Sequence, residues 1–305
     1  MVLPEFRFHQ PLTIRNALEL LGQNSNATAM AGGTDLLVEM KKGLRQHSDV
    51  ISLLNILELK EIREDNKSLS IGACSIHSDV LRSPLVIEFA PALAEATAKI
   101  GSEQIRNTGT IGGNICTAAS CCDTAPALLA MHASVEIADK ESTRSVPLKD
   151  FFIFNKKTIL QPGELVTRIL IPKPKARTGA CYEKFGLREA GSIAVVSVAA
   201  SLTIKKNILT EVSIVIGAVA PTPKISDQAI KALIGKRVED FGMDSPLLNE
   251  AGDAAVRDSI PIDDIRGGAQ FRRDVLKVLT QRAVRRAMEK VKIKGGVGGG
   301  YRNQA

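Results

Sequence analysis

The sequence of 305 residues contains no tryptophan and only two tyrosines, and aromatic residues make up 4% of the chain. Proteins that bind nucleic acid often stack bases on aromatic side chains and carry a recognisable binding motif. Because neither feature is present, the net charge of +7 does not indicate a nucleic-acid partner. That charge suits an anionic cofactor or an acidic protein partner.

Long hydrophobic runs are also missing. The most apolar stretch, residues 193–204, is interrupted by Ser197 and Ser201 and is too short to span a bilayer. The first ten residues carry Glu5, Arg7 and His9 and lack the apolar core of a signal peptide. We therefore expect no membrane span and a cytoplasmic location.

The cysteines are few, odd in number and contain no Cys-x-x-Cys pair: Cys74, Cys116, Cys121, Cys122 and Cys181. This count argues against a disulfide framework. Cys116, Cys121 and Cys122 are clustered, which leaves open a metal or redox role. Small buried packing residues are the favoured interpretation, because adjacent cysteines rarely bind one metal ion together.

Two glycine pairs stand out among the features that are present. Segment 29–37 contains Gly32-Gly33 followed by Thr34, and segment 110–115 contains Gly112-Gly113 followed by Asn114. A single pair is more often an ordinary turn. Glycine lets the backbone approach a ligand closely, and free N–H groups where a helix opens favour an anion. Two such segments could hold a diphosphate between them, which indicates a dinucleotide cofactor.

Short helices and strands alternate up to Pro172, with a capped helix beginning near Thr13 and ending at Gly22. Helices are expected at 11–21, 36–41, 75–81, 91–99 and 123–131, and strands at 28–31, 49–54, 68–73, 134–138 and 164–171. The Pro- and Lys-rich segment 172–179 indicates a boundary. After it we expect a hairpin of strands 191–204 and 209–220, then helices at 224–233, 245–258 and 268–291.

Several motifs together resemble the FAD-binding medium subunit of the molybdenum hydroxylases, the xanthine dehydrogenase and carbon monoxide dehydrogenase family. They run in order over nearly the whole chain: Ala31-Gly-Gly-Thr-Asp-Leu-Leu37, Ile105-Arg-Asn-Thr-Gly-Thr-Ile-Gly-Gly-Asn-Ile115, Val146-Pro-Leu-Lys-Asp-Phe-Phe152, Pro162-Gly-Glu-Leu165, Tyr182-Glu-Lys-Phe185, Ala218-Val-Ala-Pro-Thr-Pro223 and Asp264-Ile-Arg-Gly-Gly-Ala-Gln-Phe-Arg-Arg273.

The resemblance implies an α+β fold. It consists of a two-subdomain FAD-binding domain of the vanillyl-alcohol oxidase (PCMH) type, followed by a smaller α+β C-terminal domain. The expected limits are residues 1–175 for the first domain, with subdomains at about 1–55 and 56–175, and residues 176–292 for the second. Residues 293–305 are expected to form a flexible tail.

The resemblance also implies the cofactor-binding residues, with the FAD diphosphate against backbone N–H groups of both glycine segments. Asp123 would accept a hydrogen bond from a cofactor hydroxyl, or it could instead be a helix N-cap. Lys184 would lie near the flavin, or it could be a surface lysine. The full expected set is Ala29, Met30, Ala31, Gly32, Gly33, Thr34, Asp35, Leu36, Ile100, Thr110, Ile111, Gly112, Gly113, Asn114, Asp123, Leu165, Val166 and Lys184.

The implied function is that of an electron-transfer oxidoreductase subunit with FAD as its cofactor and no metal or catalytic acid or base of its own. A large molybdopterin-binding subunit and a small subunit with two [2Fe-2S] clusters would complete the complex, expected as a dimer of heterotrimers. Some relatives carry an insertion for a [4Fe-4S] cluster near the second glycine pair, and residues 114–123 contain no such insertion.

Three other functions stay open. The first is a stand-alone flavin-dependent oxidoreductase of the same fold. The second is a binding module that has lost the cofactor. The third is a nicotinamide-binding domain, although no Gly-x-Gly-x-x-Gly follows a strand.

Overall fold

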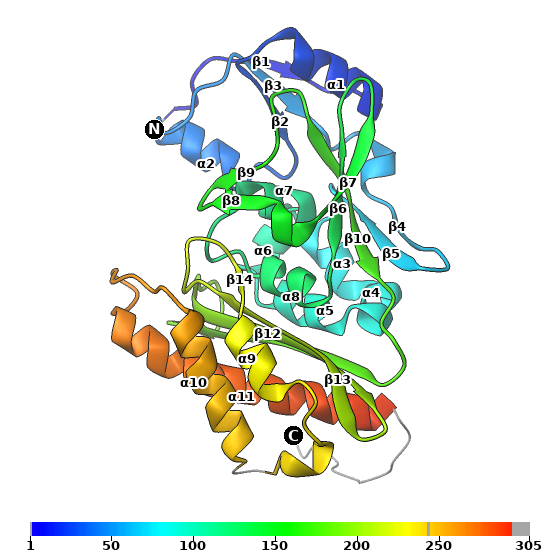
Figure 1. Ribbon diagram of the computed structural model, residues 1–305. Helices are drawn as coiled ribbons and strands as arrows, with labels where there is room; N and C mark the ends of the chain where they lie inside the picture. The colour runs from blue at the N-terminus through cyan, green and yellow to red at the C-terminus, as the bar shows by residue number, and fades with distance from the viewer. Residues whose placement is uncertain (1, 243–244, 295–305) are drawn as a thin grey trace.

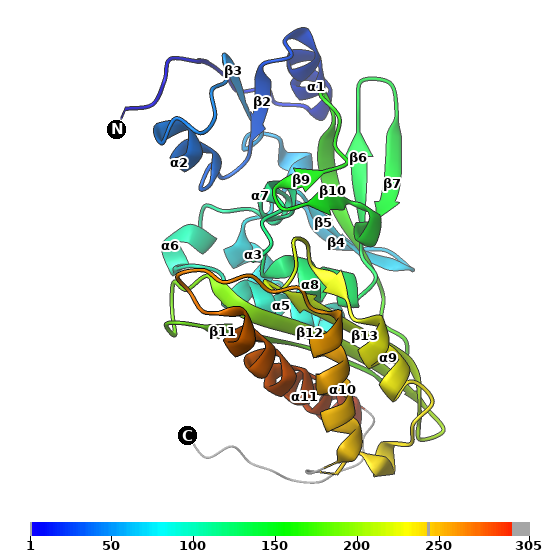
Figure 2. The same ribbon diagram turned by 60° about the vertical axis from the view of Figure 1, so that its left-hand side comes forward.

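The computed structural model describes residues 2–242 and 245–294, which form three stacked α/β bodies (Figure 1). The N-terminal lobe lies at one end, the second subdomain lies in the middle, and the C-terminal domain lies at the other end. Figure 2 shows the same order from another side. Within these residues, no helix is both long and apolar enough to cross a membrane.

The N-terminal lobe is a small parallel sheet with one helix packed on it. Its strands run in the order β1-β3-β2. Helix α1 begins after Thr13, whose hydroxyl accepts a hydrogen bond from the N–H of Asn16. The helix continues through Gly22, so the expected end at this glycine is wrong. The bounds are β1 Arg7–His9, α1 Ile14–Gln23, β2 Ala27–Met30, α2 Leu36–Lys41 and β3 Asp49–Ser52.

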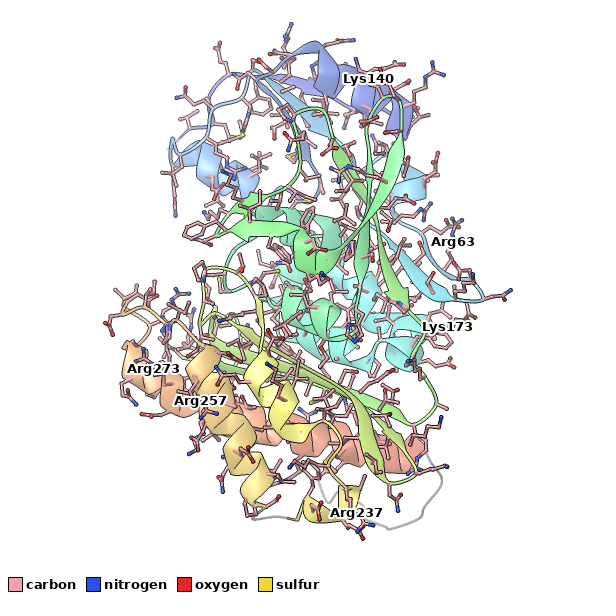
Figure 3. The ribbon with its side chains drawn as sticks, in the orientation of Figure 1. Arg63, Lys140, Lys173, Arg237, Arg257 and Arg273 are labelled. Atoms are coloured by element: carbon pink, nitrogen blue, oxygen red, sulfur yellow. The ribbon has the colours of Figure 1, made fainter. Side chains whose placement is uncertain are left out.

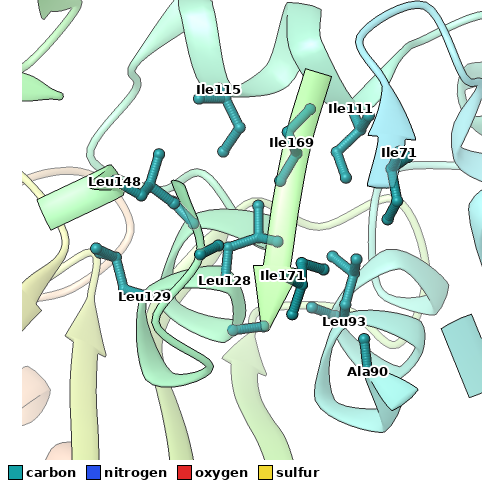
Figure 4. Close-up of a cluster of buried hydrophobic side chains, with 14 of the residues drawn as sticks. Ile71, Ala90, Leu93, Ile111, Ile115, Leu128, Leu129, Leu148, Ile169 and Ile171 are labelled. Carbon is teal, nitrogen blue, oxygen red and sulfur yellow. The ribbon is translucent and has the colours of Figure 1, made fainter. Parts of the chain in front are cut away.

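The second subdomain has a five-stranded sheet in the order β4-β5-β10-β6-β7 and contains the largest buried core. Figure 4 shows side chains of this core, from the sheet and from the helices beside it. The bounds are η1 Leu57–Leu59, β4 Ile62–Glu64, β5 Ser68–Gly72, α3 His77–Arg82, α4 Pro84–Phe89, α5 Pro91–Ala98, α6 Glu103–Arg106, α7 Ile111–Thr117, α8 Thr124–Ala130, β6 Ser134–Ala138, β7 Thr143–Pro147, η2 Leu148–Asp150, β8 Phe152–Phe154, β9 Lys157–Thr158 and β10 Leu165–Pro172.

The C-terminal domain is an antiparallel sheet, β11-β12-β13-β14, with helices on one face and α5 and α8 of the second subdomain against the sheet as well. Lys206 and Asn207 join β12 to β13 with φ values of 50° and 61°, as a tight hairpin turn requires. The bounds are β11 Thr178–Gly186, β12 Ala194–Lys205, β13 Ile208–Gly217, β14 Lys224–Ile225, α9 Asp227–Leu233, η3 Val238–Asp240, α10 Pro246–Asp258 and α11 Ala269–Lys294.

Two expectations are corrected by these bounds. The segment expected to be a helix at 224–233 begins as strand β14, and α9 starts only at Asp227. No helix was expected at the second glycine pair, but this pair lies inside the first turn of α7. Most of the expected tail, residues 295–305, lies outside the described residues.

The basic side chains labelled in Figure 3 come from both domains. Arg63 and Lys173 lie on the second subdomain, whereas Arg257 and Arg273 lie on the C-terminal domain. Basic side chains therefore occur on both of these parts of the molecule.

Candidate functional site

A cavity of about 600 Å³ lies between the N-terminal lobe and the second subdomain, and the C-terminal domain contributes residues 191–193 to its wall. Its lining includes every expected site residue except Ile111 and Lys184. The fold thus brings together two glycine segments that are about eighty residues apart in the sequence.

The first glycine segment links β2 to α2 and provides free backbone donors. Gly33 has a φ of +69°, a conformation that other residues rarely adopt. Within the described part of the chain, no hydrogen bond is donated by the N–H groups from Gly32 to Leu36. A run of unpaired N–H groups on a cavity wall is suited to an anionic group such as a phosphate.

The second glycine segment differs from this expectation, because its backbone donors already have partners. The N–H of Ile111 donates to the Ser75 carbonyl (3.1 Å), and that of Gly112 donates to the Ala73 carbonyl (2.9 Å). The N–H of Gly113 donates to the hydroxyl oxygen of Thr110, the N-cap of α7 (3.1 Å). The second segment therefore does not repeat the free donors of the first.

Gly32 and Gly112 each allow a close approach to another part of the protein. A Cβ on Gly32 would lie 2.0 Å from the carbonyl oxygen of Thr108, and a Cβ on Gly112 would lie 2.6 Å from Ala73. The Thr117 hydroxyl also donates across the cavity to Asp35 at 3.3 Å. Gly32 and Gly112 are thus required for close contact within the protein, whatever they do for a ligand.

Asp123 lies at the N-cap position of α8, but its side chain does not cap the helix. Its carboxylate accepts a hydrogen bond from the Tyr182 hydroxyl at 2.6 Å and from the Lys184 ammonium at 2.7 Å. Burial raises the pKa of Asp123, and the positive charge of Lys184 opposes that rise. The N-cap alternative for Asp123 and the surface alternative for Lys184 are both wrong, since the Lys184 side chain is 6% exposed.

Tyr182 and His77 were missed from the sequence. Tyr182 stands two positions before Lys184 on a strand, so alternation alone places both side chains on one face. His77 lines the cavity and is 2% exposed, and its Nδ1 has no hydrogen-bond partner in the described structure. Burial lowers the pKa of His77 to about 4, which keeps its ring neutral at physiological pH.

The cysteines gather around the same cavity. Cys74, Cys116, Cys121 and Cys122 line it, and burial raises the pKa of Cys74, Cys116 and Cys122 to about 12. In the metal-free protein these thiols therefore stay protonated at neutral pH. Among the described residues, no group of three or more His, Cys, Asp or Glu side chains is arranged to hold a metal ion.

Three charged side chains close one edge of the cavity. Glu39 on α2 pairs with Arg45 at 2.9 Å and with Lys156 at 2.5 Å, and Lys156 lies in the turn between β8 and β9. The pair with Lys156 connects the two subdomains across the cavity. This contact was not expected from the sequence, because no pattern relates residues 117 positions apart.

Two family models account for most of the chain. One, the FAD-binding domain in molybdopterin dehydrogenase, matches residues 4–174. The chain belongs to this family. The other, the CO dehydrogenase flavoprotein C-terminal domain, matches residues 180–287. The protein is therefore an FAD-binding subunit of a molybdenum hydroxylase-type oxidoreductase.

Individual relatives are similar over nearly their full length. The carbon monoxide dehydrogenase medium chain of Hydrogenophaga pseudoflava is 32% identical over 94% of this chain and 98% of its own. The glyceraldehyde dehydrogenase medium chain of Sulfolobus acidocaldarius is 31% identical over 93% of this chain and 98% of its own. Both comparisons cover the two domains together.

Solved structures agree with the fold. Carbon monoxide dehydrogenase from Hydrogenophaga pseudoflava superposes with a TM-score of 0.90 at 32% identity, covering 95% of this chain and 99% of that chain. Quinoline 2-oxidoreductase from Pseudomonas putida 86 gives a TM-score of 0.89 at 27% identity, covering 95% and 99%. The expected α+β fold, with an FAD-binding domain followed by a C-terminal domain, is confirmed.

Proposed function

We propose that this chain is the electron-transfer subunit of a molybdenum hydroxylase complex. Electrons would arrive from [2Fe-2S] clusters of a partner subunit and leave for an external acceptor. Bound FAD supplies the redox chemistry, accepting electrons and passing them on. The observation that carries the proposal is the cavity between the subdomains, which has free N–H donors on one wall.

Three ion-paired carboxylates of the cavity favour an electron carrier over a site that transforms its own substrate. Asp123 is paired with Lys184, Glu39 with Arg45 and Lys156, and Glu164 with Arg144. His77 is buried and neutral. General acid–base catalysis needs a group that is free to exchange a proton with a substrate, and these groups are already engaged.

The residues that would hold FAD are those of the sequence-based set. We infer that the free N–H groups of Gly32 to Leu36 bind the diphosphate, and that Thr110 and Asn114 add side-chain contacts from the opposite wall. Ile100, Leu165 and Val166 supply apolar contacts. Asp123 accepts a hydrogen bond from the cofactor, while Ile111 and Lys184 act from behind the cavity wall.

The assembly is inferred from the relatives. Several of them are named as medium chains or FAD subunits, and one solved relative is a Cu,Mo-CO dehydrogenase. We propose a small [2Fe-2S] subunit and a large molybdopterin-binding subunit as partners, two heterotrimers per complex, and a cytoplasmic location. The FAD-binding domain would span residues 1–175, with subdomains at about 1–55 and 56–175, and the C-terminal domain residues 176–292.

Removal of FAD from the purified complex tests this function. Without FAD, dithionite should still reduce the iron–sulfur clusters, as seen by electron paramagnetic resonance. After excess dithionite is removed, electron transfer from the reduced clusters to an artificial acceptor should stop. Adding FAD back should restore it. Acceptor reduction that continues at the same rate without FAD would contradict the proposal.

The alternative is a stand-alone flavin-dependent oxidoreductase of the same fold. It predicts that the isolated, FAD-loaded chain oxidises a substrate without any partner subunit. Relatives named as chains of larger enzymes argue against it. Co-purification from the native cell, with molybdenum and iron analysis of the isolated complex, separates the two possibilities.

A further inference from the structure

Three side chains from the two domains form one hydrogen-bonded unit beneath the cavity. Asp123 belongs to the FAD-binding domain, whereas Tyr182 and Lys184 lie on β11 of the C-terminal domain. One carboxylate oxygen of Asp123 accepts from the Tyr182 hydroxyl at 2.6 Å, and the other accepts from the Lys184 ammonium at 2.7 Å. Each oxygen of the carboxylate is therefore held by a different donor.

The carboxylate of Asp123 faces the cavity on one side and its two hydrogen-bond donors on the other. Asp123 lines the cavity, but Tyr182 and Lys184 do not. Tyr182 is 2% exposed and the Lys184 side chain is 6% exposed, so both approach the carboxylate from the protein interior. A carboxylate has about four acceptor positions, and the two donors leave acceptor capacity for a ligand.

Nothing in α8 fixes the orientation of Asp123. Its side chain makes no capping bond to that helix, although it occupies the N-cap position. Lys184 is itself anchored, because its ammonium also donates to the carbonyl of Lys99 at 2.9 Å. The orientation of the carboxylate therefore depends on β11 and on what anchors β11.

We propose that Tyr182 and Lys184 are positioning residues that aim the Asp123 carboxylate at bound FAD, so that the C-terminal domain completes the FAD site. This inference rests on the proposed role of Asp123 as a cofactor ligand. It assigns to Tyr182 a role in cofactor binding, and it gives Lys184, expected only to lie near the flavin, the role of supporting Asp123.

A double-mutant cycle on the full chain tests the inference. FAD-free protein is titrated with FAD, and the Kd is measured for wild type, Asp123→Ala, Tyr182→Phe and the double variant. We expect about a tenfold or larger rise in Kd for Asp123→Ala and about a fivefold rise for Tyr182→Phe. The double variant should bind like Asp123→Ala alone, because Tyr182 acts through Asp123.

Two further comparisons separate positioning from general destabilisation. Ser70→Ala removes a buried hydroxyl that has no hydrogen-bond partner in the described structure and lies outside the cavity lining. It should leave both the Kd and the visible circular dichroism of bound flavin unchanged, whereas Tyr182→Phe should change both. Lys184→Met should also weaken binding, and Lys184→Arg should restore most of it.

The inference is overturned if Tyr182→Phe binds FAD as wild type does, or if its effect multiplies that of Asp123→Ala in the double variant. If Tyr182→Phe does not fold, the same comparison of FAD Kd values is made with Lys184→Met, Asp123→Ala and the variant that combines them, and it is judged in the same way. These outcomes concern FAD affinity alone. Failure of the proposed electron transfer would instead appear in the FAD-removal experiment with the Kd values unaffected.

Discussion

Gly32 and Gly33 are neighbours that need to be glycine for different reasons. Gly33 adopts a φ of +69°, whereas the Cα of Gly32 faces the carbonyl oxygen of Thr108, where a Cβ would lie 2.0 Å away. The sequence alone suggested that these glycines let the backbone approach a ligand closely. The structure adds a collision within the protein for Gly32 and backbone strain for Gly33.

Replacing Gly32 by alanine should therefore destabilise the FAD-free protein as well as weaken FAD binding. We expect a loss of about 2–4 kcal/mol in the free energy of unfolding, because backbone atoms must move apart. Urea unfolding of the FAD-free protein measures this. Gly242→Ala, with nothing within 4 Å of the added Cβ, serves as the control. A free energy of unfolding for Gly32→Ala equal to that of the wild type would show that Gly32 and the carbonyl of Thr108 are not in tight contact.

The buried His77 should make folding stability depend on pH. Its pKa in the folded protein is lowered to about 4 from the ordinary 6.5, mainly by burial. As pH falls from about 6.5 to 4, the His77 ring is protonated in the unfolded chain but stays neutral in the folded chain. Folding stability is therefore lost over this pH range. The shift corresponds to roughly 3 kcal/mol in total. His77→Gln should show a smaller loss between pH 7 and 5 in urea unfolding, and an equal loss would refute the assignment.

At the scale of the element, helix α7 explains why the two glycine segments are not equivalent. The sequence predicted a helix directly after the first segment, with the bounds that α2 has in the structure, Leu36–Lys41, and it predicted no helix at the second segment. For the second segment, the helix begins one residue before Gly112, so the glycines lie within the helix. Local patterning could not reveal this, because the carbonyls of Ala73 and Ser75 that receive its first N–H groups come from a distant part of the chain.

Thr110 is the residue that starts α7. Thr110→Ala removes the oxygen that accepts the Gly113 N–H and should cost about 1 kcal/mol of stability. Thr110→Ser keeps the hydroxyl and should retain most of that stability. Thermal unfolding of the FAD-free variants is the measurement, and equal effects of Ala and Ser would show that the cap contributes nothing.

Over the whole molecule, most of the longer helices and strands could be predicted, because hydrophobic periodicity is a local signal; the boundary near residue 172 stays a prediction. The contacts between domains could not be predicted. Glu95 on α5 accepts hydrogen bonds from the Tyr182 N–H, Arg286 and Lys290, at 2.8, 2.7 and 2.8 Å. Its partners lie between 87 and 195 positions away, and no spacing rule relates them.

Glu95→Ala should therefore weaken the contact between the FAD-binding domain and the C-terminal domain. The Tyr182 N–H loses its acceptor, while Arg286 keeps Glu183 and Lys290 keeps the Ala180 carbonyl, so we expect a loss of about 1–3 kcal/mol in the free energy of unfolding, measured by urea. Glu58→Ala, at an exposed position in η1, is the control. Unfolding midpoints that do not differ between the two variants would contradict a role for Glu95 at this contact.

The dependence of Asp123 on β11 has a consequence for how the protein is made. A ribosome that has synthesised the first 175 residues has released both glycine segments but not Tyr182 or Lys184. The nascent chain would then hold flavin only weakly, and stable loading would wait until the last domain has emerged and folded. Cofactor insertion would thus act as a checkpoint that marks finished chains as ready for assembly.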